Sequence, residues 1–360
     1  MSRLYETLDL KYIWPKPYVG AAAVYDGYLS DADGIVRGTI QVKVAKGKTD
    51  RRIGKFLAKV TATVQLADEP KKISFKGGVV DSDVRGLVSV MSAGGHILNA
   101  QVGEYGLGGT MDGLTIDGAR NVFTGKYEGD GEFADAASGC MGVYNLAGGS
   151  GALSVSVTKK GKVKISGTVN GVKVSATSQL LVGNEVCCIP IVIAKKASLA
   201  LNLLISKDGK SVMVQGAASQ SWTAGKAGNV GLGAKFRMDG AAGVRALPGL
   251  FEAYLPNGID VAASGTKWVV AGGAKAGKVA FVKGGNTIDE SELGANPSGL
   301  KLSYKQKDGT FKGSFKVYCL EGNGKIKAYT ANVTGVMIGA KGYGTATIKK
   351  PFTVIPITIE

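Results

Sequence analysis

The sequence predicts an all-β protein made of antiparallel meanders that form β-barrel or β-sandwich units. Apolar and polar residues alternate with period two at residues 39–44, 152–157 and 172–177, as in strands with one buried face. Turn pairs such as Asn170-Gly171 and Asp308-Gly309 stand between strand segments, and such pairs favour two-residue hairpins. No amphipathic helix longer than about ten residues can be recognised from periodicity.

Glycine supports the same fold class. The chain has 360 residues, of which 55 are glycine and 9 are proline, and the absence of a Gly-X-Y period excludes collagen. Hydrophobic residues make up 44% and charged residues 20%, so the chain can bury a sizeable core and general disorder is excluded. The surplus of glycine then indicates many turns between short strands.

An internal repeat is visible in the first two thirds of the chain. Residues 38–48 resemble residues 151–162, because each segment has a glycine, an alternating strand and a turn of lysine and glycine. An aromatic-glycine opening precedes each copy, Tyr25-Asp26-Gly27-Tyr28 in the first and residues 123–127 in the second. A more divergent copy begins at residues 250–255. We therefore predict quasi-repeats of about 100 residues, the size of a sandwich or half-barrel.

The predicted organisation has four parts. Residues 1–17 form an extended lead-in, because their X-Pro steps disfavour helix. Residues 18–122 form one β unit and residues 123–222 a second, which can also pack with the first as a single barrel. Residues 223–360 form a C-terminal β domain, and the boundary is expected where Ser, Ala and Gly dominate, at residues 221–233.

The second repeat also resembles a known family. It has the aromatic-glycine opening, a glycine-rich loop at 148–151, a meander at 151–180, a short apolar strand at 187–194 and a final hairpin at 199–222 that ends in tryptophan. In these features residues 18–360 resemble a β-rich repeat region of large secreted or surface proteins from Verrucomicrobia, Kiritimatiellae and Lentisphaerae bacteria. The resemblance implies the fold and a secreted or cell-surface location, but no activity and no site. The first residues lack a signal-peptide pattern, so we expect a fragment or a mature form.

The charge limits the kinds of partner. Lys+Arg is 44 and Asp+Glu is 28, a net charge of +16, yet only eight of the basic residues are arginine. Nucleic-acid readers rely on arginine, whereas lysine spread along a chain is typical of solvated strand faces. We therefore expect no nucleic-acid partner, while a polysaccharide or cell-envelope polymer of acidic character fits the charge. No apolar run reaches the roughly 18 residues of a membrane span, so no transmembrane segment is expected.

The four cysteines are Cys140, Cys187, Cys188 and Cys319, and they show no C-x-x-C spacing. We expect buried thiols that act as small apolar side chains. A bridge from Cys140 to one of the neighbouring pair is the alternative. Because Cys187 and Cys188 are adjacent, they are predicted to point to opposite faces of a strand.

No catalytic constellation can be recognised. His96 is the only histidine and has no G-x-S-x-G motif beside it, so a turn or strand position is expected. Asp31-Ala32-Asp33 and Asp81-Ser82-Asp83 carry carboxylates two residues apart but lack the later ligands of a calcium loop. We interpret both as hairpin loops, and we expect neither a metal nor a cofactor.

Trp14, Trp222 and Trp268 are the candidate ligand-binding residues. Aromatic rings exposed on a sheet can stack on sugars, and the alternative is that these rings fill the ends of a barrel or sandwich. The sequence thus favours a non-enzymatic extracellular or cell-surface β module with a structural, adhesive or carbohydrate-binding role. The alternative is a polysaccharide-acting hydrolase that uses a carboxylate pair.

Overall fold

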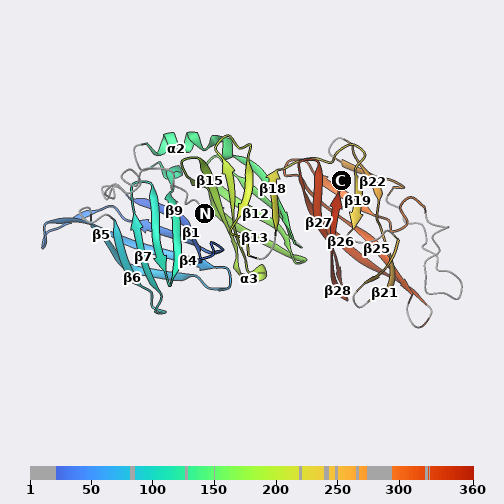
Figure 1. Cartoon of the computed structure of the whole chain (residues 1–360), viewed down its shortest axis with the longest axis horizontal. Coiled ribbons are helices and arrows are strands. Elements are labelled where there is room, and N and C mark those ends of the chain that lie inside the picture. The colour runs from blue at the N-terminus through green and yellow to red at the C-terminus, as the bar shows by residue number, and fades with distance from the viewer. Residues whose placement is uncertain are drawn as a thin grey trace. The chain divides into compact units, whose positions relative to one another are not determined.

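The computed structural model describes residues 22–81, 86–125, 129–149, 151–218, 221–238, 243–247, 250–264, 267–273, 294–320, 323 and 325–360. The predicted lead-in at 1–17, with Trp14, lies outside these residues. Antiparallel sheets dominate (Figure 1), which confirms the predicted all-β class. Two compact units divide the chain. The first contains Met1–Gly142, Ser156–Ile165 and Ser175–Gln220, and the second contains Val143–Val155, Ser166–Val174 and Ser221–Glu360.

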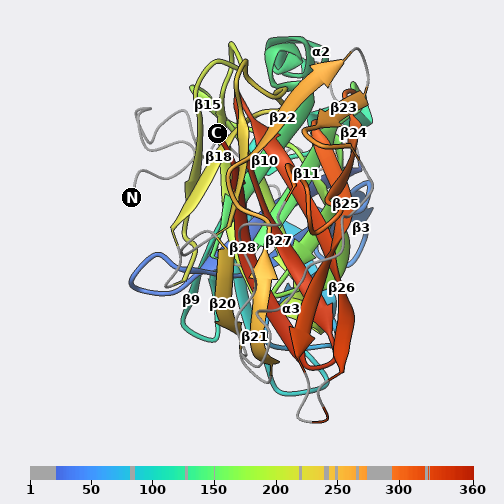
Figure 2. The same ribbon diagram turned by 90° about the vertical axis from the view of Figure 1, so that its right-hand side faces the viewer.

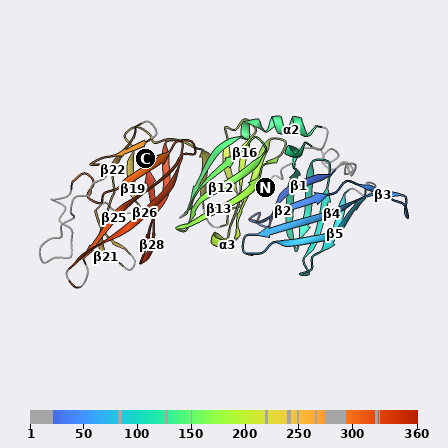
Figure 3. The same cartoon turned by 180° about the vertical axis from the view of Figure 1, so that it is seen from behind.

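The N-terminal sheet has nine strands, in the order β3-β4-β2-β1-β9-β8-β7-β6, with β5 paired to β4. Figure 3 shows β1, β2, β4 and β5 of this sheet side by side. The bounds are β1 (Ala23–Ser30), β2 (Val36–Val44), β3 (Lys48–Asp50), β4 (Lys55–Leu66), β5 (Ile73–Asp81), β6 (Leu87–Met91), β7 (Ile97–Val102), β8 (Gly106–Met111) and β9 (Leu114–Arg120).

This sheet curves around its own core. Strands β5 and β6 come into contact, so the sheet is barrel-like. Alternate residues of β2, from Ile40 to Val44, are buried inside it, together with Phe75 of β5 and Leu98 of β7. The period-two pattern at residues 39–44 therefore gives the predicted half-buried strand. Residues 51–54 form a turn and Lys55 begins β4.

Two further sheets follow along the chain. A five-stranded sheet has the order β13-β12-β11-β10-β18, and a four-stranded sheet has the order β14-β15-β16-β17. The bounds are β10 (Gly142–Gly148), β11 (Gly151–Val157), β12 (Lys162–Val169), β13 (Val172–Gln179), β14 (Leu181–Val182), β15 (Val186–Ile193), β16 (Leu199–Ser206), β17 (Val212–Gln215) and β18 (Trp222–Lys226).

The predicted meander at 151–180 is confirmed as β11, β12 and β13, which are neighbours in one sheet. Its second turn has positive φ at both Asn170 (50°) and Gly171 (73°), the geometry of a type I′ hairpin. The predicted hairpin at 199–222 is only partly correct. It consists of β16 and β17, which end at Gln215, whereas Trp222 begins a strand that pairs with β10 in the other sheet.

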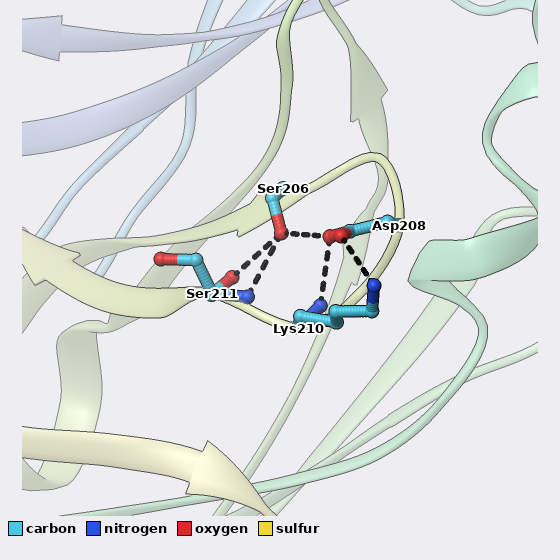
Figure 4. A network of polar contacts seen from close by, with 4 residues as sticks. All are labelled: Ser206, Asp208, Lys210 and Ser211. Carbon is cyan, nitrogen blue, oxygen red and sulfur yellow. Dashed lines mark hydrogen bonds and ion pairs between the residues drawn. The ribbon is translucent and has the colours of Figure 1, made fainter.

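Side chains close the β16–β17 turn, as Figure 4 shows. The Ser206 hydroxyl donates to Asp208 Oδ1 at 2.6 Å and accepts the backbone N–H of Ser211 at 2.9 Å. The same Asp208 oxygen accepts the N–H of Lys210 at 3.0 Å. Short Ser and Asp side chains thus replace the backbone hydrogen bonds that a turn lacks.

The apolar run of β15 is explained by burial on both faces. One face carries Cys188, which packs with Ala119 and Leu181, while the opposite face carries Cys187 and Ile189, which are also fully buried. A strand buried on both sides needs no polar alternation. The prediction that the two adjacent cysteines point to opposite faces is therefore confirmed.

The C-terminal sheet has eight strands in the order β23-β22-β19-β28-β27-β26-β25-β24. Its end strands, β23 and β24, come into contact, so this sheet is also barrel-like (Figure 2). The bounds are β19 (Lys235–Met238), β22 (Ile259–Ser264), β23 (Lys267–Val270), β24 (Lys301–Lys305), β25 (Thr310–Leu320), β26 (Ile326–Ile338), β27 (Lys341–Lys349) and β28 (Phe352–Ile359). A separate hairpin joins β20 (Gly243–Leu247) to β21 (Leu250–Leu255).

Helices are few and short in the described chain. They are η1 (Val122–Thr124), α2 (Asp130–Ala136), η2 (Ser138–Cys140) and α3 (Ala194–Ala197). The two aromatic-glycine openings differ in structure, because Tyr25–Tyr28 lie in β1 whereas Phe123 lies in η1. The sequence echo at these openings therefore does not correspond to the same local conformation.

Candidate functional site

The outer face of strands β24, β25 and β26 carries an ordered set of exposed lysines. Leu302 and Tyr304 of β24 pack against the core, so the alternate residues of that strand point outward. Phe311 and Phe315 do the same for β25. Among the outward residues of these strands, we call the lysines and their polar neighbours the lysine face: Lys301, Ser303, Lys305, Lys312, Ser314, Lys316, Thr330 and Asn332.

The strand register interleaves the four lysines. Lys305 lies opposite Thr310 and Lys301 lies opposite Ser314. Along the outward positions of β25, the lysines therefore come in the order Lys305, Lys312, Lys301, Lys316, and they alternate between β24 and β25. Residues two apart on a strand are about 6.8 Å apart and neighbouring strands about 4.8 Å apart, so successive lysine β-carbons are about 8 Å apart. The result is a regular zigzag of positive charge on a sheet.

Hydroxyl and amide groups fill the positions between the charges. Ser303 lies opposite Lys312, Asn332 lies opposite Ser314, and Thr330 accepts a hydrogen bond from Lys316 Nζ at 2.6 Å. These groups can donate and accept hydrogen bonds. The face can therefore offer a ligand both charge and neutral polar contacts.

Only one carboxylate of the described chain neutralises this face. Asp308 forms an ion pair with Lys305 at the β24–β25 turn. Burial opposes ionisation of Asp308, but hydrogen bonds from Lys305 and Thr310 hold the pKa of its carboxyl below the ordinary value. No described carboxylate forms an ion pair with Lys301 or Lys312, so most of the charge on the face stays uncompensated.

The lysine face has a defined border within its compact unit. At β26, the hydroxyl of Thr334 lies 3.2 Å from that of Thr168, within hydrogen-bonding distance. Further across the same side of the sheet, a β-carbon at Gly171 would lie 2.8 Å from Val354 Cγ2. Residues of the 166–174 segment thus cover the side of β26–β28, while β24 and β25 keep their lysines exposed.

The two tryptophan candidates in the described chain differ in exposure. Trp268 is 6% exposed, and its ring stacks on Tyr304 with centroids 4.8 Å apart and lies 5.3 Å from the ring of Phe311. It belongs to the barrel core where β23 meets β24, which leaves little of the ring for a sugar.

Trp222 is half-buried against two glycines. A β-carbon at Gly148 would lie 2.7 Å from Trp222 Cγ, and one at Gly151 would lie 2.8 Å from Trp222 Cη2. The indole therefore occupies the space that side chains at these positions would need, which explains the glycine-rich loop at 148–151. Trp222 and Trp268 lie on strands of different sheets, β18 and β23.

His96 lies in the loop between β6 and β7, as a turn position predicts. Its Nδ1 is 2.7 Å from Asp112 Oδ2, and the other oxygen of Asp112 accepts the backbone N–H of Ile97 at 2.8 Å. The Ser92 hydroxyl accepts the backbone N–H of His96 at 3.1 Å. The arrangement joins the β6–β7 loop to the β8–β9 turn, and it presents no Ser-His-Asp relay because the hydroxyl serves the backbone.

The paired acidic residues have local roles. Asp31 accepts the N–H groups of Asp33 and Ile35 and forms an ion pair with Arg37 at 2.6 Å, as a hairpin loop predicts. Asp81 pairs with Lys55 at 3.0 Å, while Asp83 lies outside the described residues. Within the described ranges no group of three or more His, Cys, Asp or Glu side chains is placed to hold a metal ion.

Two buried ionisable side chains lie together, Arg120 at the end of β9 and Asp130 at the start of α2. Arg120 Nε is 3.3 Å from Asp130 Oδ1, and each side chain is only 1% exposed. Beside them, the Tyr25 hydroxyl donates to the Gly103 carbonyl at 2.6 Å, and burial raises the pKa of Tyr25 to about 12. Charge composition cannot reveal this pair, since its two members stand ten residues apart in the sequence and their contact depends on the fold.

Asp26 is the second buried carboxylate. Its two oxygens accept hydrogen bonds from Gln41 Nε2 at 2.8 Å and Asn121 Nδ2 at 3.1 Å. Burial raises the pKa of Asp26 despite these hydrogen bonds. A raised carboxyl pKa can mark a general acid, but here both oxygens are occupied by amides that join β1, β2 and the start of η1.

Among the described residues, the helices are too short or too polar to cross a bilayer. No family model matches the chain, and no curated protein matches it.

Proposed function

We propose that this protein is a non-enzymatic extracellular or cell-surface module that binds an anionic polysaccharide through the lysine face. The observation that carries the proposal is the zigzag of Lys301, Lys305, Lys312 and Lys316 on one exposed sheet surface. A row of charges at a regular spacing complements an extended polymer with a repeated negative charge better than a compact ligand.

The side chains between the lysines favour a polysaccharide over a nucleic acid. Proteins that bind single-stranded nucleic acid combine positive charge with aromatic rings on which the bases stack. On the lysine face, Ser303, Ser314, Thr330 and Asn332 stand between the charges instead. An aromatic ring on the same side of β25, Tyr318, follows Lys316 at the end of the row and does not alternate with the lysines. Such groups can bond the hydroxyls of sugar rings, while the lysines meet uronate or sulfate groups.

The alternative, a hydrolase with a carboxylate pair, gains little support. Asp26 and Asp130 are the buried acids of the described chain. Each is engaged by partners that position it structurally, two amides for Asp26 and Arg120 for Asp130. A hydrolase needs two carboxyl groups that face one substrate.

A panel of immobilised polymers tests the proposal. The full chain is passed at low salt over a polyuronate, a sulfated polysaccharide, a neutral glucan and single-stranded DNA. We expect retention on the two anionic polysaccharides and release by salt, because exposed charges are screened. Tighter retention on DNA would point to a nucleic-acid partner, and equal retention on the neutral glucan would rule out the charge-based account. Retention on none would leave a structural role.

A further inference from the structure

Two buried thiols from separate segments lie against the same part of the four-stranded sheet. Cys140 ends η2, and its Sγ donates to the Ser206 carbonyl of β16 at 3.5 Å. Cys187 of β15 pairs directly with Ile205, the residue before Ser206. The Cys140 thiol is also the largest influence that raises the pKa of the Cys187 thiol, as expected of neighbouring sulfur atoms, and both residues are fully buried.

The other two cysteines are placed elsewhere. Cys188 points to the opposite face of β15 and packs with Ala119 and Leu181. Cys319 belongs to the core of the C-terminal sheet. The structure therefore distinguishes between the members of the adjacent pair, which the sequence leaves equivalent as partners for Cys140.

We propose that Cys140 and Cys187 form a disulfide when the chain folds in the presence of an oxidised low-molecular-weight disulfide such as glutathione disulfide. One cysteine thiolate attacks the glutathione disulfide, which releases one glutathione thiolate and leaves a mixed disulfide. The second cysteine then attacks the protein sulfur of that mixed disulfide and releases the second glutathione. The two cysteines lose two protons and two electrons, and the oxidant is reduced to two thiols.

The timing follows from the surroundings of the thiols. The neighbouring Cys140 thiol, together with burial, raises the pKa of the Cys187 thiol. Because the thiolate is the nucleophile, the closed native structure reacts slowly, and the exchange takes place while the segments assemble. This disposition suits the oxidising environment expected for a secreted or surface protein.

The bridge would connect distant parts of the chain. Between Cys140 and Cys187 stand 46 residues (187 − 140 − 1), so the cross-link closes a long loop in the unfolded state. Restricting such a loop is expected to raise the unfolding temperature by roughly 5–10 °C. The bridge would also fix η2, which precedes β10, onto the sheet formed by β15 and β16.

The test refolds the full chain from denaturant, once with reduced and oxidised glutathione and once with a strong reductant. Free thiols are alkylated under denaturing conditions before digestion and mass spectrometry. We expect a linked Cys140–Cys187 peptide, with Cys188 and Cys319 alkylated, and a higher unfolding temperature in the oxidised sample. Cys187→Ala should abolish the temperature difference, while Cys188→Ala should retain it.

Other outcomes would overturn the inference. Four alkylated cysteines after oxidative refolding, or a linkage that includes Cys188 or Cys319, would show that the pair is wrong. A linked protein with no gain in unfolding temperature would refute the stabilising role. Peptide mapping of the unmodified sequence decides the pairing even if a variant fails to fold, and none of these results depends on polysaccharide binding.

Discussion

Removing the carboxylate of Asp130 breaks a buried ion pair in the first compact unit and leaves the Arg120 charge behind. Arg120 and Asp130 are each 1% exposed and lie 3.3 Å apart, so Asp130→Ala removes from the buried guanidinium the carboxylate that lies beside it. Breaking a buried pair in this way typically costs about 3–5 kcal/mol. With a urea dependence of about 2–3 kcal/mol per molar for a unit of this size, we expect the unfolding midpoint to fall by about 1–2.5 M.

The control removes both charges together. In the double variant Arg120→Met, Asp130→Leu neither charge of this pair remains, so its loss of stability should be smaller than that of Asp130→Ala. Urea unfolding followed by circular dichroism measures all three proteins. A single variant within about 1 kcal/mol of the original protein, or a double variant less stable than the single one, would refute the reasoning that the buried charge carries the cost.

Three further predictions concern other parts of the fold. Trp268→Ala should destabilise the C-terminal sheet by about 3–5 kcal/mol, because the ring stacks on Tyr304 where β23 meets β24. Trp268→Phe keeps an aromatic ring and should lose clearly less stability. Equal losses of the two variants in thermal unfolding would contradict the stacking argument. Asp26→Asn should gain stability relative to the original protein as the pH rises from about 4. Burial raises the pKa of Asp26 in the folded state, so the folded state binds the proton of this carboxyl more tightly than the unfolded state. The original protein therefore loses stability as the pH rises through this window, while the Asn variant has no such proton to lose. Denaturation at several pH values checks the sign, and a constant difference would disprove it. Gly171→Ala should cost about 1–2 kcal/mol, because Gly171 has φ of 73° and a β-carbon there would lie 2.8 Å from Val354 Cγ2. Gly113→Ala, in a turn with the same positive φ and open space around it, is the matched control and should cost less in chemical denaturation.

Local signals predicted where the hairpins turn, but not always the length of the turn. Asp308-Gly309, expected in a two-residue turn, lies in a four-residue turn between Lys305 and Thr310. Asn170-Gly171 forms the two-residue turn expected of it, and Asp112-Gly113 forms another, with φ of 47° and 83°. The second turn carries an Asp-Gly pair, which favours the same two-residue geometry. The residues that favour a turn are adjacent in the sequence, so sequence patterns can predict where the chain turns.

Long-range pairing could not be predicted in the same way. Strand β1 pairs with its neighbour in sequence, β2, and also with the distant β9. Strand β10 likewise pairs with the distant β18 on its other side. These neighbours are set by how the whole sheet packs, and no residue pattern within one strand specifies them. The expectation that Trp222 ends the β16–β17 hairpin failed for this reason.

The lysine face illustrates the same limit at the level of function. The alternation at residues 300–304 is visible in the sequence, and it correctly separates Leu302 and Tyr304 from the outward lysines. The interleaving of Lys301 with Lys312 depends on the register of β24 against β25. Composition predicted an acidic polymer as a possible partner, whereas only the register gives the surface that could bind it.

The central claim is tested most directly by comparing two charge-matched variants. In the first, the four lysines of the lysine face are changed to glutamine. In the second, the same number of charges is removed at Lys159, Lys160, Lys162 and Lys164, which are exposed on the β11–β12 hairpin. If each exposed contact contributes about 0.5 kcal/mol, the first variant should bind the anionic polysaccharide about thirtyfold more weakly.

Isothermal titration calorimetry of both variants against a polyuronate at fixed low salt gives the decisive comparison. The account predicts the thirtyfold loss for the lysine-face variant and a loss of less than about threefold for the hairpin variant, since general attraction by net charge is shared by both. Equal losses in the two variants would contradict a specific site on β24–β26. Unchanged affinity in the lysine-face variant would contradict the proposed function itself.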